Sequence, residues 1–325
     1  MKIIFLGTPE FAVPALRALI AHHEVVAVVT MPDKPSGRGK KIKPTPVEVE
    51  ALAHSIPVHK FKKIRIDGVE ALKSIDADVI ITCAYGQILS AEILNMKKYG
   101  VLNIHGSVLP KYRGASPIQW TVINGDSTAG LSVLKSDVGM DDGPVLTTME
   151  IDLSDYPNIT SLELFDILSQ LSPKIILQAL ASIEDGSVVY IQQNHEVATH
   201  CKKLTKAIAN IDLSKSAKEV VHLINGINAW PVATLTLDDD PIKVYKSGVL
   251  TSERVVQLGI LEPHNYLIGE VVVSNLKQGL VVRVGDGFIE LLQLQKPGGK
   301  VLDYKSYLNG NKLKVGRIFS RVNKE

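Results

Sequence analysis

The sequence has little cysteine and no long hydrophobic run, and both absences limit the class of protein. Its two cysteines, Cys83 and Cys201, lie far apart and without the spacing of a metal site. Because Cys83 falls in an apolar stretch, we expect buried, reduced thiols and a cytoplasmic protein. No apolar run approaches the ~20 residues that a membrane-spanning helix needs. Residues 1–6 are typical of a strand rather than of a secretory signal peptide.

The glycine-rich motif of dinucleotide-binding folds is absent as well. Lys2–Leu6 predicts a buried strand, and Gly7 with Pro9 predicts a tight turn after it. No Gly-x-Gly-x-x-Gly follows, so nothing here would cradle a pyrophosphate, and this argues against an NAD enzyme. Residues 13–21 and 25–30 continue as a helix and a strand. Alternating strands and helices predict a Rossmann-like α/β domain with a parallel sheet and right-handed crossovers.

A metal site is not indicated either. Asp137, Asp141 and Asp142 lie close together and could be mistaken for a magnesium or calcium site. Two glycines and a proline lie among them and leave no EF-hand register. Since aspartates in loops are commonly caps or turn residues, we expect no metal here.

Positive and negative charges nearly balance over the whole chain, but each is concentrated in particular stretches. The formal net charge is +2. Residues 34–65 carry nine Lys or Arg against two Glu, a net charge of +7, and residues 293–325 carry a net +6. Residues 137–200 carry a net −10. Either basic stretch alone is explained more simply as a solvated surface. Together they suit an RNA ligand that touches two domains.

Residues 100–143 contain the side chains with the most evident chemistry. Residues 101–104 predict a short buried strand, and Asn103 and His105 lie two apart, so both would project from one face. At the carboxyl end of a parallel strand this face opens into the crevice where α/β proteins bind ligands. An amide beside an imidazole can polarise a carbonyl and stabilise the oxyanion formed on attack. On spacing alone the alternative, that both side chains bind loop backbone, is favoured.

A family resemblance favours the catalytic interpretation of Asn103 and His105. The run Asn-Ile-His-Gly-Ser-Val-Leu-Pro-Lys-Tyr-Arg-Gly-Ala-Ser-Pro-Ile-Gln from residue 103, followed by Asp-Val-Gly-Met-Asp-Asp-Gly from residue 137, resembles the signature of the folate-dependent formyltransferases. The start Phe-Leu-Gly-Thr-Pro-Glu-Phe-Ala and the loop Pro-Asp-Lys-Pro-Ser-Gly-Arg-Gly-Lys-Lys from residue 32 are similar to the branch that acts on methionyl-tRNA. The similarity runs essentially end to end and weakens after about residue 186.

The resemblance and the pattern of elements together imply two domains. After about Lys206 short β-rich segments alternate with turn residues, which is typical of a small barrel. This part resembles the OB-like C-terminal domain of the family. We expect a Rossmann-like formyltransferase domain over residues 1–188, a linker over 189–206 and an OB-like tRNA-binding domain over 207–325. Within the first domain, Ser172-Pro173 predicts a break between helical stretches 162–171 and 174–183.

The resemblance also implies a catalytic trio, Asn103, His105 and Asp141. The Asn103 amide would donate to the developing oxyanion, a kind of contact worth ~3 kcal/mol. Asp141 would favour the protonated His105 ring, hold its orientation and help to move the proton of the incoming amine. No nucleophilic Ser or Cys is needed, so Ser107 and Cys83 should form no covalent intermediate.

Contacts with the two substrates are implied in the same way. The formyl donor is 10-formyltetrahydrofolate, bound as a substrate, and the acceptor is initiator methionyl-tRNA. For Tyr85, simple packing is an equal alternative to folate binding. We expect a monomer. The residues implied to contact folate are Ser107, Val108, Leu109, Pro110, Tyr85, Gln87 and Leu89, and those implied to contact tRNA are Arg38, Lys40 and Lys41.

Three alternatives stay open at this point. The same trio would formylate a small amine such as a UDP-amino sugar or glycinamide ribonucleotide, although such substrates do not need strongly basic surfaces. A further family member would hydrolyse the formyl donor. A non-catalytic RNA-binding protein could also retain the fold.

Overall fold

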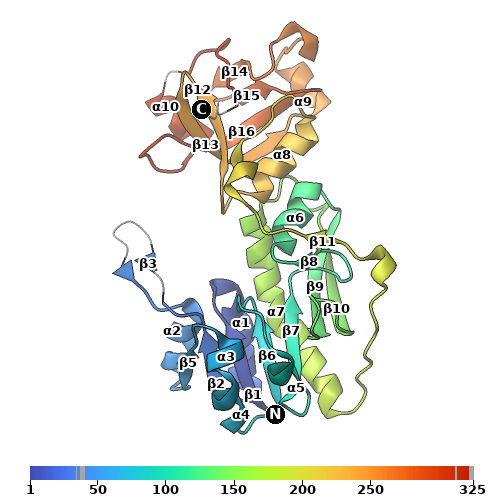
Figure 1. Cartoon of the computed structure of the whole chain (residues 1–325). Helices are drawn as coiled ribbons and strands as arrows, with labels where there is room; N and C mark the ends of the chain where they lie inside the picture. The colour runs from blue at the N-terminus through green and yellow to red at the C-terminus, as the bar shows by residue number, and fades with distance from the viewer. Residues whose placement is uncertain (34, 37–40, 312, 322–325) are drawn as a thin grey trace. The chain divides into compact units, whose positions relative to one another are not determined.

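The computed structural model describes residues 1–33, 35–36, 41–311 and 313–321, and the chain divides into two compact units (Figure 1). The first unit consists of Met1–Pro117, Ala129–Ile151 and Phe165–Cys201. The second consists of Ile118–Thr128, Asp152–Leu164 and the chain from Lys202 onward. The domain boundaries at residues 188 and 207 stay a prediction.

The first unit is built on a seven-stranded sheet in the order β10-β9-β7-β6-β1-β2-β5. The five strands from β7 to β5 pair in parallel, as the sequence predicted. They are apolar and buried along nearly their whole length, which is typical of strands covered on both faces. The strands are β1 (Lys2–Gly7), β2 (Glu24–Thr30), β5 (Val58–Lys60), β6 (Val79–Cys83), β7 (Val101–His105), β9 (Thr128–Lys135) and β10 (Val145–Asp152).

The sheet is not parallel throughout, because β9 runs antiparallel to β7. Between these strands the chain enters α6 (Pro117–Asn124), and Ile118–Thr128 belongs to the second unit. The chain therefore does not cross the sheet there, and it returns to the sheet from the edge at which β7 ended. The mixed sheet corrects the purely parallel one that the alternation of elements predicted.

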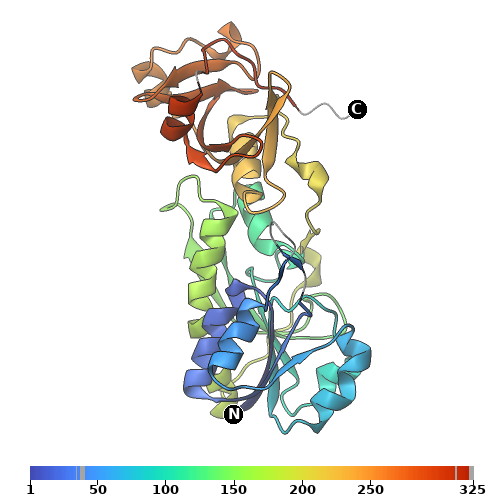
Figure 2. The same ribbon diagram turned by 90° about the vertical axis from the view of Figure 1, so that its left-hand side faces the viewer.

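Helices cover both faces of this sheet (Figure 2). Apolar side chains of α3, α4 and α5 pack with alternate residues of β1, β2 and β6 in one core. The other face carries α1, α2 and the part of α7 that belongs to the first unit (Figure 2). The helices are α1 (Val13–His22), α2 (Pro46–Ala53), α3 (Ile64–Asp67), α4 (Val69–Ser74), α5 (Ala91–Asn95) and α7 (Ser161–Glu184), with a 3₁₀ turn η1 (Glu10–Ala12) before α1.

Helix α7 is continuous through Pro173, so the break predicted at Ser172-Pro173 is wrong. A proline inside a helix removes one backbone N–H and leaves the carbonyl four residues earlier without its donor. Here the Ser172 hydroxyl donates to that carbonyl, Ser169 O, at 2.7 Å. Ser172 is fully buried, and its hydroxyl compensates for the missing donor.

The second unit contains an antiparallel sheet in the order β12-β13-β16-β15-β14, with β17 beside β16. Residues 316–320 bind both of its edges. Ser320 exchanges two backbone hydrogen bonds with Thr236 in β12, and Gly316 and Arg317 bond to Val271 at the start of β14. The sheet is thereby closed into a small barrel, as predicted.

Most barrel strands lie where the sequence predicted them, and helices complete the unit. Helix α8 (Ala217–Gly226) was not predicted, and its apolar face forms part of the barrel core. The other elements are β12 (Ala233–Leu237), β13 (Asp240–Val249), α9 (Ser252–Gln257), β14 (Val271–Asn275), β15 (Gly279–Arg283), β16 (Phe288–Gln295), β17 (Leu302–Asp303) and α10 (Tyr304–Gly310), with 3₁₀ turns η3 (Lys206–Ala209) and η4 (Pro263–Asn265).

Two further observations bear on the predictions from composition. Cys83 and Cys201 are both buried and unpaired, as expected, and burial raises the pKa of the Cys83 thiol. Across the described residues, no helix is both long and apolar enough to cross a membrane.

The hydrogen bond from the Ser172 hydroxyl to Ser169 O can be tested by substitution. We expect Ser172→Ala to lower the free energy of unfolding by about 1–3 kcal/mol, because it leaves a buried carbonyl unsatisfied. Ser182→Ala is the matched control, since Ser182 donates to Ala179 O in the same helix, a carbonyl that the helix itself already pairs. Its effect should stay within about 0.5 kcal/mol. Equal losses in the two variants, measured by denaturant unfolding, would contradict this account.

Candidate active site

The candidate site lies at the carboxyl end of β7. Asn103 pairs with Thr82 of β6 and with Leu134 of β9, and His105 pairs with Ser132 of β9. The strand is therefore paired on both sides up to Ile104, and His105 is paired with β9 alone. As the two-residue spacing predicted, Asn103 and His105 leave the strand on the same side, where Asp141 meets both.

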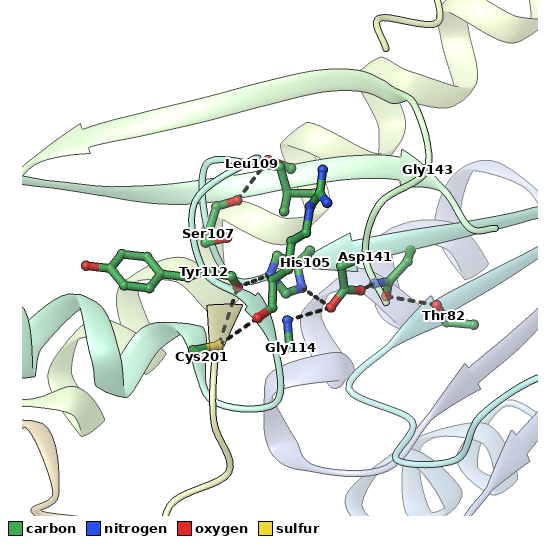
Figure 3. Close-up of polar contacts among 12 residues, drawn as sticks. Thr82, His105, Ser107, Leu109, Tyr112, Gly114, Asp141, Gly143 and Cys201 are labelled. Carbon is green, nitrogen blue, oxygen red and sulfur yellow. Dashed lines mark hydrogen bonds and ion pairs between the residues drawn. The ribbon is translucent and has the colours of Figure 1, made fainter. Parts of the chain in front are cut away.

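Asp141 brings the three predicted catalytic residues together, and Figure 3 shows it beside His105 and Gly114. Its Oδ1 accepts a hydrogen bond from Asn103 Nδ2 at 3.2 Å, and its Oδ2 lies 3.7 Å from His105 Nδ1. Oδ2 also accepts from the backbone N–H of Gly114 at 2.9 Å. Asp141 adopts a left-handed backbone, with φ of 51°, a conformation that aspartate tolerates better than most residues.

The Asn103 amide has a defined orientation. The Thr82 hydroxyl donates to Asn103 Oδ1 at 2.9 Å, so the amide nitrogen must face Asp141. One amide hydrogen is engaged with the carboxylate, and the second remains to be donated to a substrate oxygen. The geometry thus provides the donor that an oxyanion requires.

The His105 ring is 6% exposed and has acceptors at both nitrogens. Nε2 lies 2.9 Å from the backbone oxygen of Tyr112, which can only accept, so Nε2 carries a proton. Nδ1 faces the Asp141 carboxylate. The ring is thereby held between a backbone carbonyl and a carboxylate, which fixes its orientation.

The turn predicted to contact folate is held by hydrogen bonds of its own. The Ser107 hydroxyl is buried and donates to Lys111 O at 2.6 Å. Ser132 joins the turn to β9, because its hydroxyl donates to Ser107 O at 2.8 Å and accepts from Leu109 N at 3.0 Å. The Leu109-Pro110 peptide is cis. The Ser107 hydroxyl therefore stabilises the turn.

The second predicted folate segment is arranged mainly for packing. Gln87 accepts from Ile64 N and donates to Phe61 O, both at 2.9 Å, so its side chain is used within the protein. Leu89 and Tyr85 pack in the core between the sheet and α3–α5. The Tyr85 hydroxyl is buried and without a partner among the described residues, and burial raises its pKa to about 12. Folate contacts in this segment, which stay a prediction, would fall to main-chain groups.

Several predicted residues receive no structural account. Arg38 and Lys40 lie outside the described residues, and of Lys41 only the backbone is described, in β4 (Lys41–Ile42), which pairs with β3 (Pro35–Ser36).

Of the three loop aspartates, Asp137 accepts from Val138 N in its own turn. The described part of the chain contains no group of three or more His, Cys, Asp or Glu placed to hold a metal.

The sequence analysis missed the groups that hold the trio in place. Thr82 and the Gly114 N–H contact Asn103 and Asp141 directly. Gln193 reaches the Asp141 loop from a segment predicted to be a linker, and the buried Arg113 holds Gln193 in turn. Arg113 and Gly114 lie within the signature run and so carried a signal, whereas Gln193, a glutamine in a polar stretch, carried none.

An α/β sheet domain with an amide, an imidazole and a carboxylate at the end of one strand is suited to acyl transfer through an oxyanion. Comparison with known proteins narrows this class. A family model described as formyl transferase matches residues 1–180, and one described as formyl transferase, C-terminal domain, matches residues 203–312. The chain belongs to the formyl transferase family of enzymes, which confirms the resemblance seen in the sequence.

Relatives cover the chain from end to end. It is 40% identical to a methionyl-tRNA formyltransferase of Clostridium novyi over 98% of this chain and 99% of the relative. It is 41% identical to one of Agathobacter rectalis over 98% and 100%. Among solved structures, WlaRD, a sugar 3N-formyl transferase in the presence of dTDP and 5-N-formyl-THF, matches with a TM-score of 0.65 and 19% identity over 91% of this chain and 97% of that one, which shows a shared fold.

The orientation of Asn103 generates a prediction for formyl transfer. Thr82→Val keeps the shape of the side chain but removes the donor to Asn103 Oδ1, so the amide loses its fixed orientation. We expect kcat to fall about 10-fold, as for other partners that orient a reacting group. Thr82→Ser, which keeps the hydroxyl, is the control and should stay near the wild-type kcat. Equal kcat in both variants would show that the hydroxyl does not orient Asn103.

Proposed function

We propose that the chain transfers the formyl group of 10-formyltetrahydrofolate to the α-amino group of methionyl-initiator tRNA. The observation that carries this proposal is the similarity to methionyl-tRNA formyltransferases over nearly the full length of both chains. A cytoplasmic monomer is the form in which we expect it to act.

The arrangement of Asn103, His105 and Asp141 suggests a separate role for each residue in formyl transfer. The amine nitrogen attacks the formyl carbon, and the carbonyl becomes a tetrahedral oxyanion. Asn103 donates its free amide hydrogen to this oxygen, and His105 adds positive charge. Asp141 takes the proton that the amine loses, directly or through water. The bond between the formyl carbon and the folate nitrogen then breaks, and that nitrogen receives a proton.

Support for the donor comes from the fold family and from the turn next to the trio. A solved structure that shares the fold was obtained in the presence of 5-N-formyl-THF. Residues 107–110 adjoin His105 along the chain, and their hydrogen bonds to Ser132 and Lys111 give the turn one defined shape. We assign folate contacts to this turn and to Tyr85, Gln87 and Leu89.

Support for the acceptor comes from the distribution of charge. Residues 34–65 and 293–325 are strongly basic, and phosphate contacts of Lys and Arg dominate affinity for nucleic acids. We assign contacts with tRNA to Arg38, Lys40 and Lys41 and to a C-terminal domain over residues 207–325. A small amine would use neither surface.

The choice of acceptor is tested by competition. Purified protein and 10-formyltetrahydrofolate would be offered methionyl-initiator tRNA, free methionine, glycinamide ribonucleotide or a UDP-amino sugar, with formylated products detected by mass. Formylation of the charged tRNA alone supports the proposal. Formylation of a small amine would overturn the assigned acceptor, and release of formate without any formylated acceptor would indicate hydrolysis of the donor.

Substitution of Asn103 separates an enzyme from a protein that only binds RNA. We expect Asn103→Ala to lower kcat by about 100-fold or more, because an oxyanion donor is lost. The affinity for methionyl-tRNA should stay near the wild-type value, measured by filter binding. An unchanged kcat would remove Asn103 from the mechanism.

Arg38→Ala tests the basic loop. We expect kcat/KM for methionyl-tRNA to fall about 10-fold, the loss typical of one hydrogen bond between charged groups, while KM for the formyl donor is unchanged. The slope of log affinity against log salt should decrease by about 1. Lys62→Ala, at an exposed position of the same basic stretch, is the control. An equal loss of kcat/KM in both variants would mean that Arg38 contributes only its positive charge and no specific contact.

A further inference from the structure

Residues 193–201, predicted to be part of a linker, lie along one of the loops that carry the site. Thr199 O accepts from Arg113 N at 2.8 Å, and Thr199 N donates to Pro110 O at 3.1 Å. Strand β11 (His200–Cys201) pairs in parallel with β8 (Arg113–Gly114). The Cys201 thiol also contacts the backbone oxygen of Tyr112, the group that binds His105 (Figure 3).

Gln193 connects this segment to the Asp141 loop. Its Nε2 donates to the backbone oxygens of Asp141 at 2.9 Å and Gly143 at 2.7 Å. Its Oε1 accepts from Arg113 Nε at 3.0 Å and from Arg113 Nη2 at 2.8 Å. All four hydrogen-bonding positions of the amide are therefore used. Since a guanidinium only donates and a carbonyl only accepts, the amide can take no other orientation.

Arg113 is a buried cation, 4% exposed, and among the described residues its side chain contacts the neutral Gln193 amide and no carboxylate. Its remaining contact is from Nη1 to His195 Nδ1 at 3.1 Å. Because arginine stays protonated, His195 accepts here and is in its neutral form with the proton on Nε2. Burial of a charge among neutral partners is costly, and the local fold alone does not explain why it is retained.

We propose that Gln193, oriented by Arg113, is a positioning residue for Asp141. This inference rests on the proposed catalytic role of Asp141. Adjacent residues hold Asp141 at two points: the Gly114 N–H binds its carboxylate, and the Arg113 side chain, through Gln193, fixes its backbone oxygen. With both points held, the left-handed Asp141 keeps its carboxylate between Asn103 and His105. Displacement of a reacting group by 1 Å can cost ~100-fold in rate.

Gln193→Glu tests the role with little change in shape. The carboxylate can still accept from Arg113, but it cannot donate to the Asp141 and Gly143 oxygens. We expect kcat to fall ~10–100-fold, with KM for donor and acceptor within about 3-fold of wild type.

The control is Ser172→Ala, which weakens the same unit far from these contacts along the chain. A purely structural role predicts the same result in both variants: fewer folded molecules, with kcat per folded molecule unchanged. That result for Gln193→Glu would overturn the proposal. The double variant Arg113→Lys with Gln193→Glu should lose little more kcat than Gln193→Glu alone, since the two side chains act through one contact. A loss in the double variant equal to the combined losses of the two single variants would also overturn the proposal.

Asp141→Asn in the same assay separates the two levels of the argument. If Asp141→Asn loses kcat and Gln193→Glu does not, the positioning role is wrong while the catalytic role of Asp141 stands. If Asp141→Asn keeps wild-type kcat, the catalytic role is wrong, and the positioning role fails with it.

Discussion

The hydrogen bond from the Gly114 backbone to the Asp141 carboxylate is the contact on which the geometry of the site depends. It joins the loop after β7 to the loop after β9. Because β9 runs antiparallel to β7, the loop after β9 begins beside Leu102, near the opposite end of β7. The carboxylate also binds the Asn103 amide and faces the His105 ring. A shift of this one group would alter the orientation of both neighbours.

Part of this arrangement is predictable from the sequence because it is local. The two-residue spacing of Asn103 and His105 on a strand determines that they share a face, whatever the rest of the chain does. Most strand positions follow from apolar runs for the same reason. The helix α8 was also within reach, since Ser216 and Glu219 form the capping box whose spacing is visible in the sequence.

Other features depend on contacts between distant parts of the chain. Asp141 was expected at the site only through the family signature, and no periodicity links it to β7. Gln193 binds the backbone oxygen of a residue 52 positions away, and a backbone acceptor leaves no trace in residue types. The break predicted at Pro173 failed because propensity rules count the missing N–H but not the hydroxyl beside it.

The closure of the barrel by residues 316–320 has a consequence for synthesis on the ribosome. Until these residues emerge, β12 and β14 are both unpaired edges, and such edges are templates for association with other chains. The second unit also includes Ile118–Thr128 and Asp152–Leu164, which are made long before the barrel. These two segments are synthesised before the rest of their unit, the chain from Lys202 onward. A nascent chain therefore exposes these strand edges, which favour association with other chains, until residues 316–320 have been made.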